Sequence, residues 1–249
     1  MKVAVSGATG RLGGAIAEGV SASTSMQLRG IYSPRHAGKS IAGIEVADSF
    51  DAIDADVIVE CAPPDVVMEN LRRWHAKGMS AVVGTSGFTE ERIAELKSFW
   101  KGSDKGCLVV PNFSIGAVLM MRFAELAAPH FDSAEIIERH GDKKPDAPSG
   151  TALATAMRMG KHRDQSLKQN ESEMVKGVRG GTVSGVRVHS LRMKGVLSDQ
   201  EVAFSNQGEI FSITHSSTSY QSFVNGALIA IRYASTIKGV EIGLDKALR

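Results

Sequence analysis

The sequence predicts an α/β protein in which a doubly wound parallel sheet is joined to a second α+β domain with a mixed sheet. Its 249 residues can fill one large core or two modest ones, and two domains suit this length better. In the first half, short β-rich runs alternate with helical patterns, as βαβ units require. In the second half, longer alternating stretches indicate an antiparallel or mixed sheet.

The first half predicts a parallel sheet from its short apolar runs. We expect strands at 3–6, 27–32, 57–61, 81–83 and 108–110, separated by helices at 12–22, 65–77 and 89–100. Such a sheet needs both faces covered, and its ligands bind beyond the carboxyl ends of the strands. Candidate binding residues are therefore expected at those strand ends.

The second half predicts helices and a sheet of its own. We expect helices at 116–129, 149–157 and 222–237, and strands at 134–140, 185–194, 200–206 and 209–215. Residues 161–184 are polar and rich in Lys, Gly and Gln, which predicts a mobile loop. The apolar side chains of the last helix must pack on another element.

Composition narrows the class of protein. A net charge of +2, from 29 basic and 27 acidic residues without a run of either sign, supports neither a nucleic-acid partner nor a membrane surface. Cys61 and Cys107 are too few for a disulfide framework or a zinc site, so we expect no metal. Residue 3 already begins a strand, and no apolar run reaches the roughly 18 residues of a membrane span. A soluble, cytoplasmic protein is expected.

A glycine-rich turn follows the first strand, where a dinucleotide fingerprint belongs. It reads Gly7-Ala8-Thr9-Gly10-Arg11-Leu12-Gly13. Gly7 and Gly10 allow a tight turn and a close approach to pyrophosphate, while Gly13 or Gly14 lets the helix pack on the strand. The spacing is GxxGxxG rather than GxGxxG, so an ordinary strand-to-helix turn remains an alternative. Arg11 can meet a phosphate or cover the helix start.

Three further strand ends carry candidate cofactor contacts. The second strand is followed by Arg35 and has no acidic residue at its tip, which favours the 2′-phosphate of NADPH over the free ribose of NADH. An ordinary basic loop is the alternative, and NADH stays possible. The loops at 84–88 and 111–114 can hydrogen-bond a nicotinamide carboxamide, or they can be plain turns.

The segment 138–151 places two proton carriers beside an anion site. His140 and Lys144 stand four residues apart, and both side chains can exchange a proton near neutrality in a suitable cleft. Ser149 is the expected N-cap of the helix that follows Pro148, whose first amides can hold a carboxylate or phosphate. Protonation of a reacting carbon or nitrogen is the chemistry that this segment favours.

The glycine-rich turn, 83–88, 112–116 and above all 140–152 resemble the dihydrodipicolinate reductase family. The run Lys144-Pro145-Asp146-Ala147-Pro148-Ser149-Gly150-Thr151-Ala152 is the most specific part. The resemblance implies a Rossmann domain formed by 1–113 with 220–249, and a substrate-binding and tetramerisation domain at 114–219. It also implies a homotetramer.

The resemblance further implies an activity and its site residues. The activity is NAD(P)H-dependent reduction of 4-hydroxy-tetrahydrodipicolinate, a cyclic dicarboxylic imine, to tetrahydrodipicolinate in the diaminopimelate route to lysine. It makes His140 the acid/base group and Lys144 the proton donor. The implied substrate contacts are Gly141, Ser149, Gly150 and Thr151. The expected cofactor contacts are Gly7, Ala8, Thr9, Gly10, Arg11, Leu12, Arg35, Gly84, Thr85, Ser86, Val110, Pro111, Asn112 and Phe113.

Some positions depart from the family pattern and keep alternatives open. Gly141 stands where the family has a second histidine, Ser86 replaces a threonine, Tyr220 stands where an arginine is common, and 60–63 differs from the familiar Asp-Phe-Thr strand end. A non-catalytic NADP-binding sensor is therefore one alternative. A semialdehyde dehydrogenase is another, but Cys107, its would-be nucleophile, lies in an apolar strand.

Overall fold

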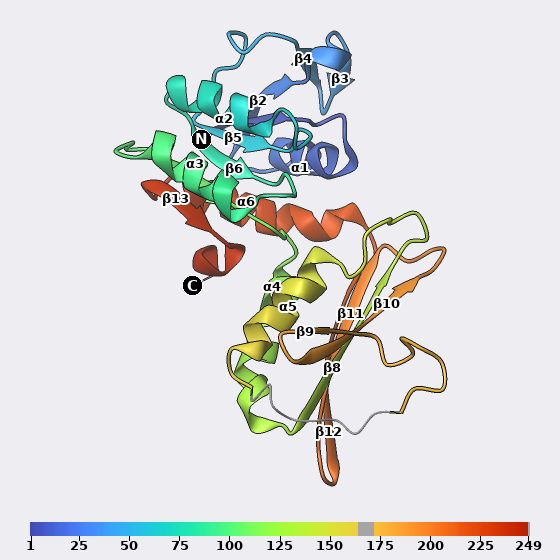
Figure 1. The fold of residues 1–249 in the computed structure, drawn as a ribbon. Helices are drawn as coiled ribbons and strands as arrows, with labels where there is room; N and C mark the ends of the chain where they lie inside the picture. Colours follow the sequence, from blue (N-terminus) through green and yellow to red (C-terminus); the bar gives the residue numbers. More distant parts are fainter. Residues whose placement is uncertain (164–171, 249) are drawn as a thin grey trace. The chain divides into compact units, whose positions relative to one another are not determined.

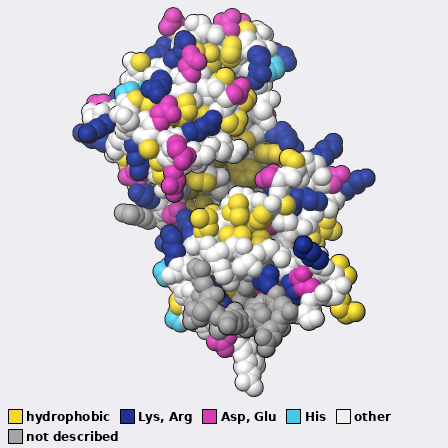
Figure 2. Space-filling view, in the orientation of Figure 1, with side chains coloured by type: hydrophobic (Ala, Val, Ile, Leu, Met, Phe, Trp, Pro, Cys, Tyr) yellow, Lys and Arg dark blue, Asp and Glu magenta, His cyan; other side chains and the backbone are white. Residues whose placement is uncertain are grey.

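The computed structural model describes residues 1–163 and 172–248. Two compact units make up the chain (Figure 1). Unit 1 comprises Met1–Ile115 with Tyr220–Arg249, and unit 2 comprises Gly116–Ser219. On the face drawn in Figure 2, basic and acidic side chains are interspersed, as the small net charge of +2 suggests.

Unit 1 is built on an eight-stranded sheet of order β13-β7-β6-β5-β1-β2-β4-β3. Its strands are β1 Lys2–Ser6, β2 Gln27–Tyr32, β3 Ser40–Ile41, β4 Ile44–Ala47, β5 Val57–Glu60, β6 Ser80–Val83, β7 Gly106–Val109 and β13 Gly239–Ile242. All neighbours pair in parallel except β3 and β4. Every residue of β5, β6 and β7 is buried, because helices cover both faces of a parallel sheet.

The helices of unit 1 form two layers. They are α1 Arg11–Ser21, α2 Val67–Ala76, α3 Glu90–Trp100 and α6 Val224–Ala234, with short 3-10 turns at Pro34–His36, Tyr220–Phe223 and Leu244–Ala247. Side chains of α2 and α3 share one core with the sheet, in which Trp74 and Trp100 are fully buried. The last helix, α6, packs against α1. The sequence prediction that this apolar helix packs on another element is confirmed.

Unit 2 contains a five-stranded mixed sheet of order β12-β11-β8-β10-β9. Its strands are β8 Ser133–His140, β9 Gly181–Val183, β10 Val186–Arg192, β11 Ser198–Asn206 and β12 Glu209–Ser217. β8 and β10 are parallel, and the other pairs are antiparallel. The helices α4 Ile115–Ala127 and α5 Gly150–Gly160 cover one face of this sheet (Figure 1), and the 3-10 turn Ala128–His130 follows α4.

The predicted fold class, a doubly wound sheet plus an α+β domain with a mixed sheet, is confirmed. The prediction of a loop over 161–184 is wrong for its last residues, because β9 at Gly181–Val183 pairs with β10. Residues 164–171 of that prediction lie outside the described residues. The short strands β3, β4 and β13 were not predicted, since two to four residues give little periodicity. Among the described residues, none of the helices has the length and apolar character that a membrane span needs.

Candidate active site

The glycine-rich turn of unit 1 is held tightly against the end of β5. Gly7 has a φ of +78°, and a Cβ there would lie 2.6 Å from the carbonyl carbon and oxygen of Cys61. A Cβ on Gly13 would lie 2.6 Å from the carbonyl oxygen of Gly7. Gly10 is the N-cap of α1. Because glycine has no side chain, no N-cap side chain accepts a hydrogen bond from the first amides of α1. These are the features that a pyrophosphate-binding turn requires.

A cleft of about 780 Å³ opens beside this turn at the carboxyl ends of β1, β2, β5 and β6. Such a volume suits a ligand larger than a simple anion. The predicted cofactor residues that line it are Gly7, Thr9, Gly10, Arg35, Gly84, Thr85 and Ser86. Further lining residues, which the sequence did not indicate, include Tyr32, Ser33, His36, Phe50, Asn70 and Arg73.

The other predicted cofactor residues do not line this cleft. Ala8, Val110 and Phe113 are buried, and Leu12 and Asn112 are partly buried. The Arg11 guanidinium lies over the Tyr220 ring, 5.2 Å from its centroid. Pro111 is exposed, and Asn112 accepts a hydrogen bond from the Ser114 amide at 2.8 Å. These residues therefore lie near the cleft, in turns or in packed positions, and do not form its lining.

Glu60, the last residue of β5, fixes several groups of the cleft wall. Its carboxylate, fully buried, accepts hydrogen bonds from the Ser6 hydroxyl, the Ala62 amide and the Trp74 indole, each at 2.8 Å. Burial raises the pKa of Glu60, although these hydrogen bonds oppose the rise. The Thr85 hydroxyl in turn donates to the Ala62 carbonyl at 2.7 Å. An acidic residue ending an apolar strand was the sequence signal for this role.

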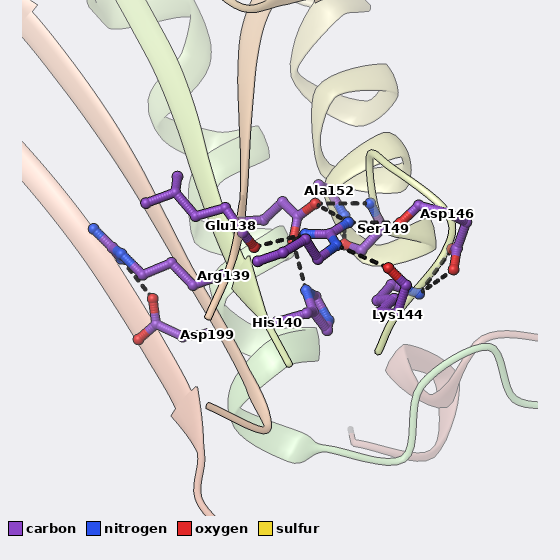
Figure 3. Close-up of polar contacts among 10 residues, drawn as sticks. Glu138, Arg139, His140, Lys144, Asp146, Ser149, Ala152 and Asp199 are labelled. Carbon is purple, nitrogen blue, oxygen red and sulfur yellow. Dashed lines mark hydrogen bonds and ion pairs between the residues drawn. The ribbon is translucent and has the colours of Figure 1, made fainter. Parts of the chain in front are cut away.

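In unit 2, His140 ends β8 and is held by a buried carboxylate. The His140 Nδ1 lies 2.5 Å from Glu138 Oε2 (Figure 3). Glu138 has no exposed surface, and Arg192 of β10 contacts both of its oxygens, at 3.1 and 3.0 Å. Although burial raises the pKa of Glu138, hydrogen bonds from Arg192, Ser190 and His140 outweigh it and hold the pKa below its ordinary value. Glu138 is therefore an anion.

The ionised Glu138 sets the tautomer of His140. A carboxylate only accepts hydrogen bonds, so the proton of a neutral imidazole must sit on Nδ1, the atom that faces Glu138. Nε2 is then the ring atom that can exchange a proton with a ligand. The arrangement matches the base-and-orienter pairs in which a carboxylate holds a catalytic imidazole.

Lys144 follows in the loop after β8, where its amide donates to the Gly141 carbonyl at 3.1 Å. Its ammonium contacts both carboxylate oxygens of Asp146, at 2.8 and 2.7 Å (Figure 3). The hydrogen bond from Lys144 lowers the pKa of Asp146. The Lys144 side chain is about a quarter exposed, at 27%, so its ammonium is accessible to a ligand that competes with Asp146.

The predicted substrate residues lie at the start of α5 and beside it. Ser149 is the N-cap, and its hydroxyl accepts from the Ala152 amide at 3.1 Å. Its own amide donates to Glu138 Oε1 at 3.3 Å. Gly150 faces open space, since a Cβ added there would have no atom within 4 Å, whereas a Cβ on Gly141 would lie 3.1 Å from the Val196 carbonyl oxygen. A side chain at 141 would therefore need that carbonyl to give way.

Sequence reasoning missed Glu138, Arg192 and Asp146. Glu138 stands two residues before His140 on one strand, so the two share a face, and this spacing is a usable signal. Arg192 reaches Glu138 from β10, 54 residues along the chain, and nothing local marks it. Its position depends on the parallel pairing of β8 with β10, which sets Arg192 beside His140.

Comparison with known proteins gives the class of protein, which is a two-domain oxidoreductase with a pyridine-nucleotide-binding α/β domain. Two family models match the chain: "Dihydrodipicolinate reductase, N-terminus" at residues 1–113 and "Dihydrodipicolinate reductase, C-terminus" at 116–248. The 4-hydroxy-tetrahydrodipicolinate reductase of Streptococcus pneumoniae (strain Hungary19A-6) is 40% identical over 254 residues, covering 100% of this chain and 99% of that protein. The chain belongs to the dihydrodipicolinate reductase family.

Solved structures agree with this assignment. The dipicolinate-bound dihydrodipicolinate reductase from Paenisporosarcina sp. TG-14 has a TM-score of 0.88 at 32% identity, covering 99% of this chain and 98% of that one. An amine dehydrogenase from Mycobacterium smegmatis has a TM-score of 0.66 at 12% identity, covering 98% and 95%. The second likeness is one of fold alone.

Proposed function

We propose that the protein reduces 4-hydroxy-tetrahydrodipicolinate to tetrahydrodipicolinate, with NADPH as the preferred reductant, in the diaminopimelate route to lysine. The observation that carries the proposal is that His140 and Lys144 both contact one ion pair, formed by the buried carboxylate of Glu138 and the partly exposed guanidinium of Arg192, in a chain of this family. A protein that only senses a dinucleotide has no physical need for two positioned proton carriers. The semialdehyde dehydrogenase alternative fails on Cys107, because its thiol is fully buried and burial raises its pKa.

The cleft of unit 1 fits a dinucleotide. Gly7 and Gly13 let the turn pack closely on the end of β5 and on the start of α1, because a Cβ at either position would lie 2.6 Å from backbone atoms. Gly7, Thr9 and Gly10 would hold the pyrophosphate, and Gly84, Thr85 and Ser86 would face the nicotinamide end. When bound, the cofactor supplies a hydride.

The residues of unit 2 supply the other requirements of the reaction. The 4-hydroxyl group of the substrate leaves as water, which gives a conjugated imine. Hydride addition to that imine moves negative charge onto the ring, so a proton must follow from a positioned acid. Lys144 donates that proton, and its positive charge attracts the dicarboxylate substrate. His140 acts as the acid/base group through Nε2. The first amides of α5, at Gly150 and Thr151, hold one substrate carboxylate.

One assay tests the function. The wild-type protein is mixed with freshly generated product of dihydrodipicolinate synthase, and the loss of reduced-cofactor absorbance is followed with NADPH and NADH in parallel. We expect oxidation with both cofactors and a lower KM for NADPH. Cofactor binding without any oxidation would support the non-catalytic sensor instead.

Arg35 carries the proposed preference for NADPH. It lines the cleft in the 3-10 turn after β2, where the 2′-phosphate would lie. We expect Arg35→Ser to raise the KM for NADPH about tenfold, equivalent to about 1.4 kcal/mol, and to leave the KM for NADH almost unchanged. Arg29→Ser, an exposed arginine of β2 that does not line this cleft, is the control. Equal effects of Arg35→Ser on both cofactors would contradict the assignment.

We also propose that the protein is a homotetramer that acts in the cytoplasm. The last strand of unit 2, β12, forms one edge of its sheet, and it exposes Ile210 and Phe211 at 81% and 43% of their surface. Apolar side chains on an open edge favour burial against another copy of the chain. Sedimentation equilibrium checks this: we expect a tetramer for the wild type and smaller species for Ile210→Glu.

A further inference from the structure

We propose that Glu138 is a positioning residue that orients both proton carriers, His140 directly and Lys144 through Arg192. The inference rests on the proposed function in one respect, which is that His140 and Lys144 act in the reaction. No predicted site residue performs this task, and Glu138 itself has no exposed surface from which to touch a substrate.

The Glu138 carboxylate contacts groups from three different elements. Oε2 meets His140 Nδ1 at 2.5 Å and Arg192 Nη1 at 3.1 Å. Oε1 meets Arg192 Nη2 at 3.0 Å and the Ser149 amide at 3.3 Å. One carboxylate thereby joins the end of β8, the end of β10 and the N-cap of α5.

Arg192 extends this control to the Lys144 loop. Its Nε donates to the Lys144 carbonyl at 3.3 Å, and its Nη2 donates to the Asp146 carbonyl at 2.6 Å. The guanidinium is planar and rigid. A carboxylate that binds both of its Nη atoms therefore also fixes the position of the carbonyl groups to which Nε and Nη2 donate. The backbone at Lys144 and at Asp146, whose carboxylate pairs with the Lys144 ammonium, is thus tied to Glu138.

Burying the charge of Glu138 costs desolvation free energy, and a role in function gives a reason for keeping it there. A buried ion pair often adds no stability over apolar residues of the same size, so its presence calls for another reason. Other charged residues near His140 in the sheet and in the chain include Arg192, its register partner on β10, and Lys144 and Asp146 in the loop that follows. Among these described groups, only Glu138 contacts the imidazole. Orientation and tautomer of the ring therefore depend on Glu138.

The test uses Glu138→Gln in the full-length protein. The two guanidinium donors of Arg192 will hold the single amide oxygen, so the amide nitrogen will face His140 Nδ1 as a donor. The neutral ring must then carry its proton on Nε2. We expect ¹⁵N NMR to show the Nδ1-protonated ring in the wild type and the Nε2-protonated ring in the variant, with His140→Gln used to assign the signal. We also expect kcat to fall on the order of 100-fold, with the KM for NADPH unchanged.

Glu135→Gln is the matched control. Glu135 lies on the same strand, at an odd separation that puts it on the other face, and it also pairs with a histidine and an arginine: His189 Nε2 at 2.7 Å and Arg179 Nη2 at 2.6 Å. We expect wild-type kcat from this variant. A loss of kcat equal to that of Glu138→Gln would show a general effect on β8 and overturn the proposal.

The remaining outcomes are also decisive. If Glu138→Gln does not fold, Glu138→Gln with Arg192→Met removes both charges at once and leaves no unpaired buried ion. Wild-type kcat in either folded variant, or an unchanged His140 tautomer in Glu138→Gln, would overturn the proposal. If the wild type oxidises no cofactor, the proposed function fails, while the NMR comparison still reports whether Glu138 sets the His140 ring.

Discussion

Lys144→Met is expected to lower kcat by about 100- to 1,000-fold, because it removes the proposed proton donor while keeping most of the side-chain volume. The Lys144 ammonium is bound to Asp146 at 2.7 Å, and the two side chains are 27% and 60% exposed. An ion pair this exposed contributes at most about 1 kcal/mol to folding. The thermal midpoint should therefore change little. Steady-state kinetics and a thermal melt of the variant measure both quantities.

Lys143→Met is the control for Lys144→Met. Lys143 is the adjacent lysine and is exposed, so the same change of charge is made one residue away. We expect its kcat to stay near the wild-type value, which separates a positioned donor from a general loss of positive charge. Near-normal turnover of Lys144→Met would remove Lys144 from the mechanism. Weaker binding of NADPH alone to that variant would point to cofactor binding instead, since a proton donor is not needed for it.

The fold could be predicted where the chain repeats a pattern over enough residues. The central strands of unit 1 are continuous apolar runs, and β11 alternates buried and partly buried residues along its length. The strands that were missed are short ones at a sheet edge or next to it, such as β3 and β9, whose pairing comes from a neighbour rather than from their own sequence. Local periodicity carries no information about such a neighbour.

The candidate site could be predicted only as far as its local motifs extend. His140, Lys144 and Ser149 lie within ten residues of one another, so one segment of sequence indicated them together. Arg192 and Glu60 act through contacts 54 and 14 residues away, with Glu138 and Trp74 respectively. Those contacts exist only once strands and helices are paired. The groups that we propose to touch ligands are thus readable from sequence, and the buried groups that orient them mostly are not.

The second large effect is expected from Gly7→Ala, which should weaken both the fold and dinucleotide binding. Gly7 has a φ of +78°, and the added Cβ would sit 2.6 Å from Cys61 carbon and oxygen and 2.8 Å from the Ala62 nitrogen. These are backbone atoms at the end of a central buried strand, so they cannot yield as a flexible side chain would. We expect a loss of about 2–4 kcal/mol in unfolding free energy. A displaced turn should also raise the NADPH Kd at least about tenfold.

Gly102→Ala separates the two causes of that loss. Gly102 has a φ of +79°, but no atom lies within 4 Å of its Cβ position, so the change imposes the same backbone strain without the collision. We expect it to cost about 1 kcal/mol of unfolding free energy and to leave the NADPH Kd unchanged. Denaturant unfolding and titration calorimetry measure the two quantities. If Gly7→Ala costs no more than Gly102→Ala and binds NADPH normally, the turn is an ordinary strand-to-helix connection, and the cofactor must be held elsewhere in unit 1.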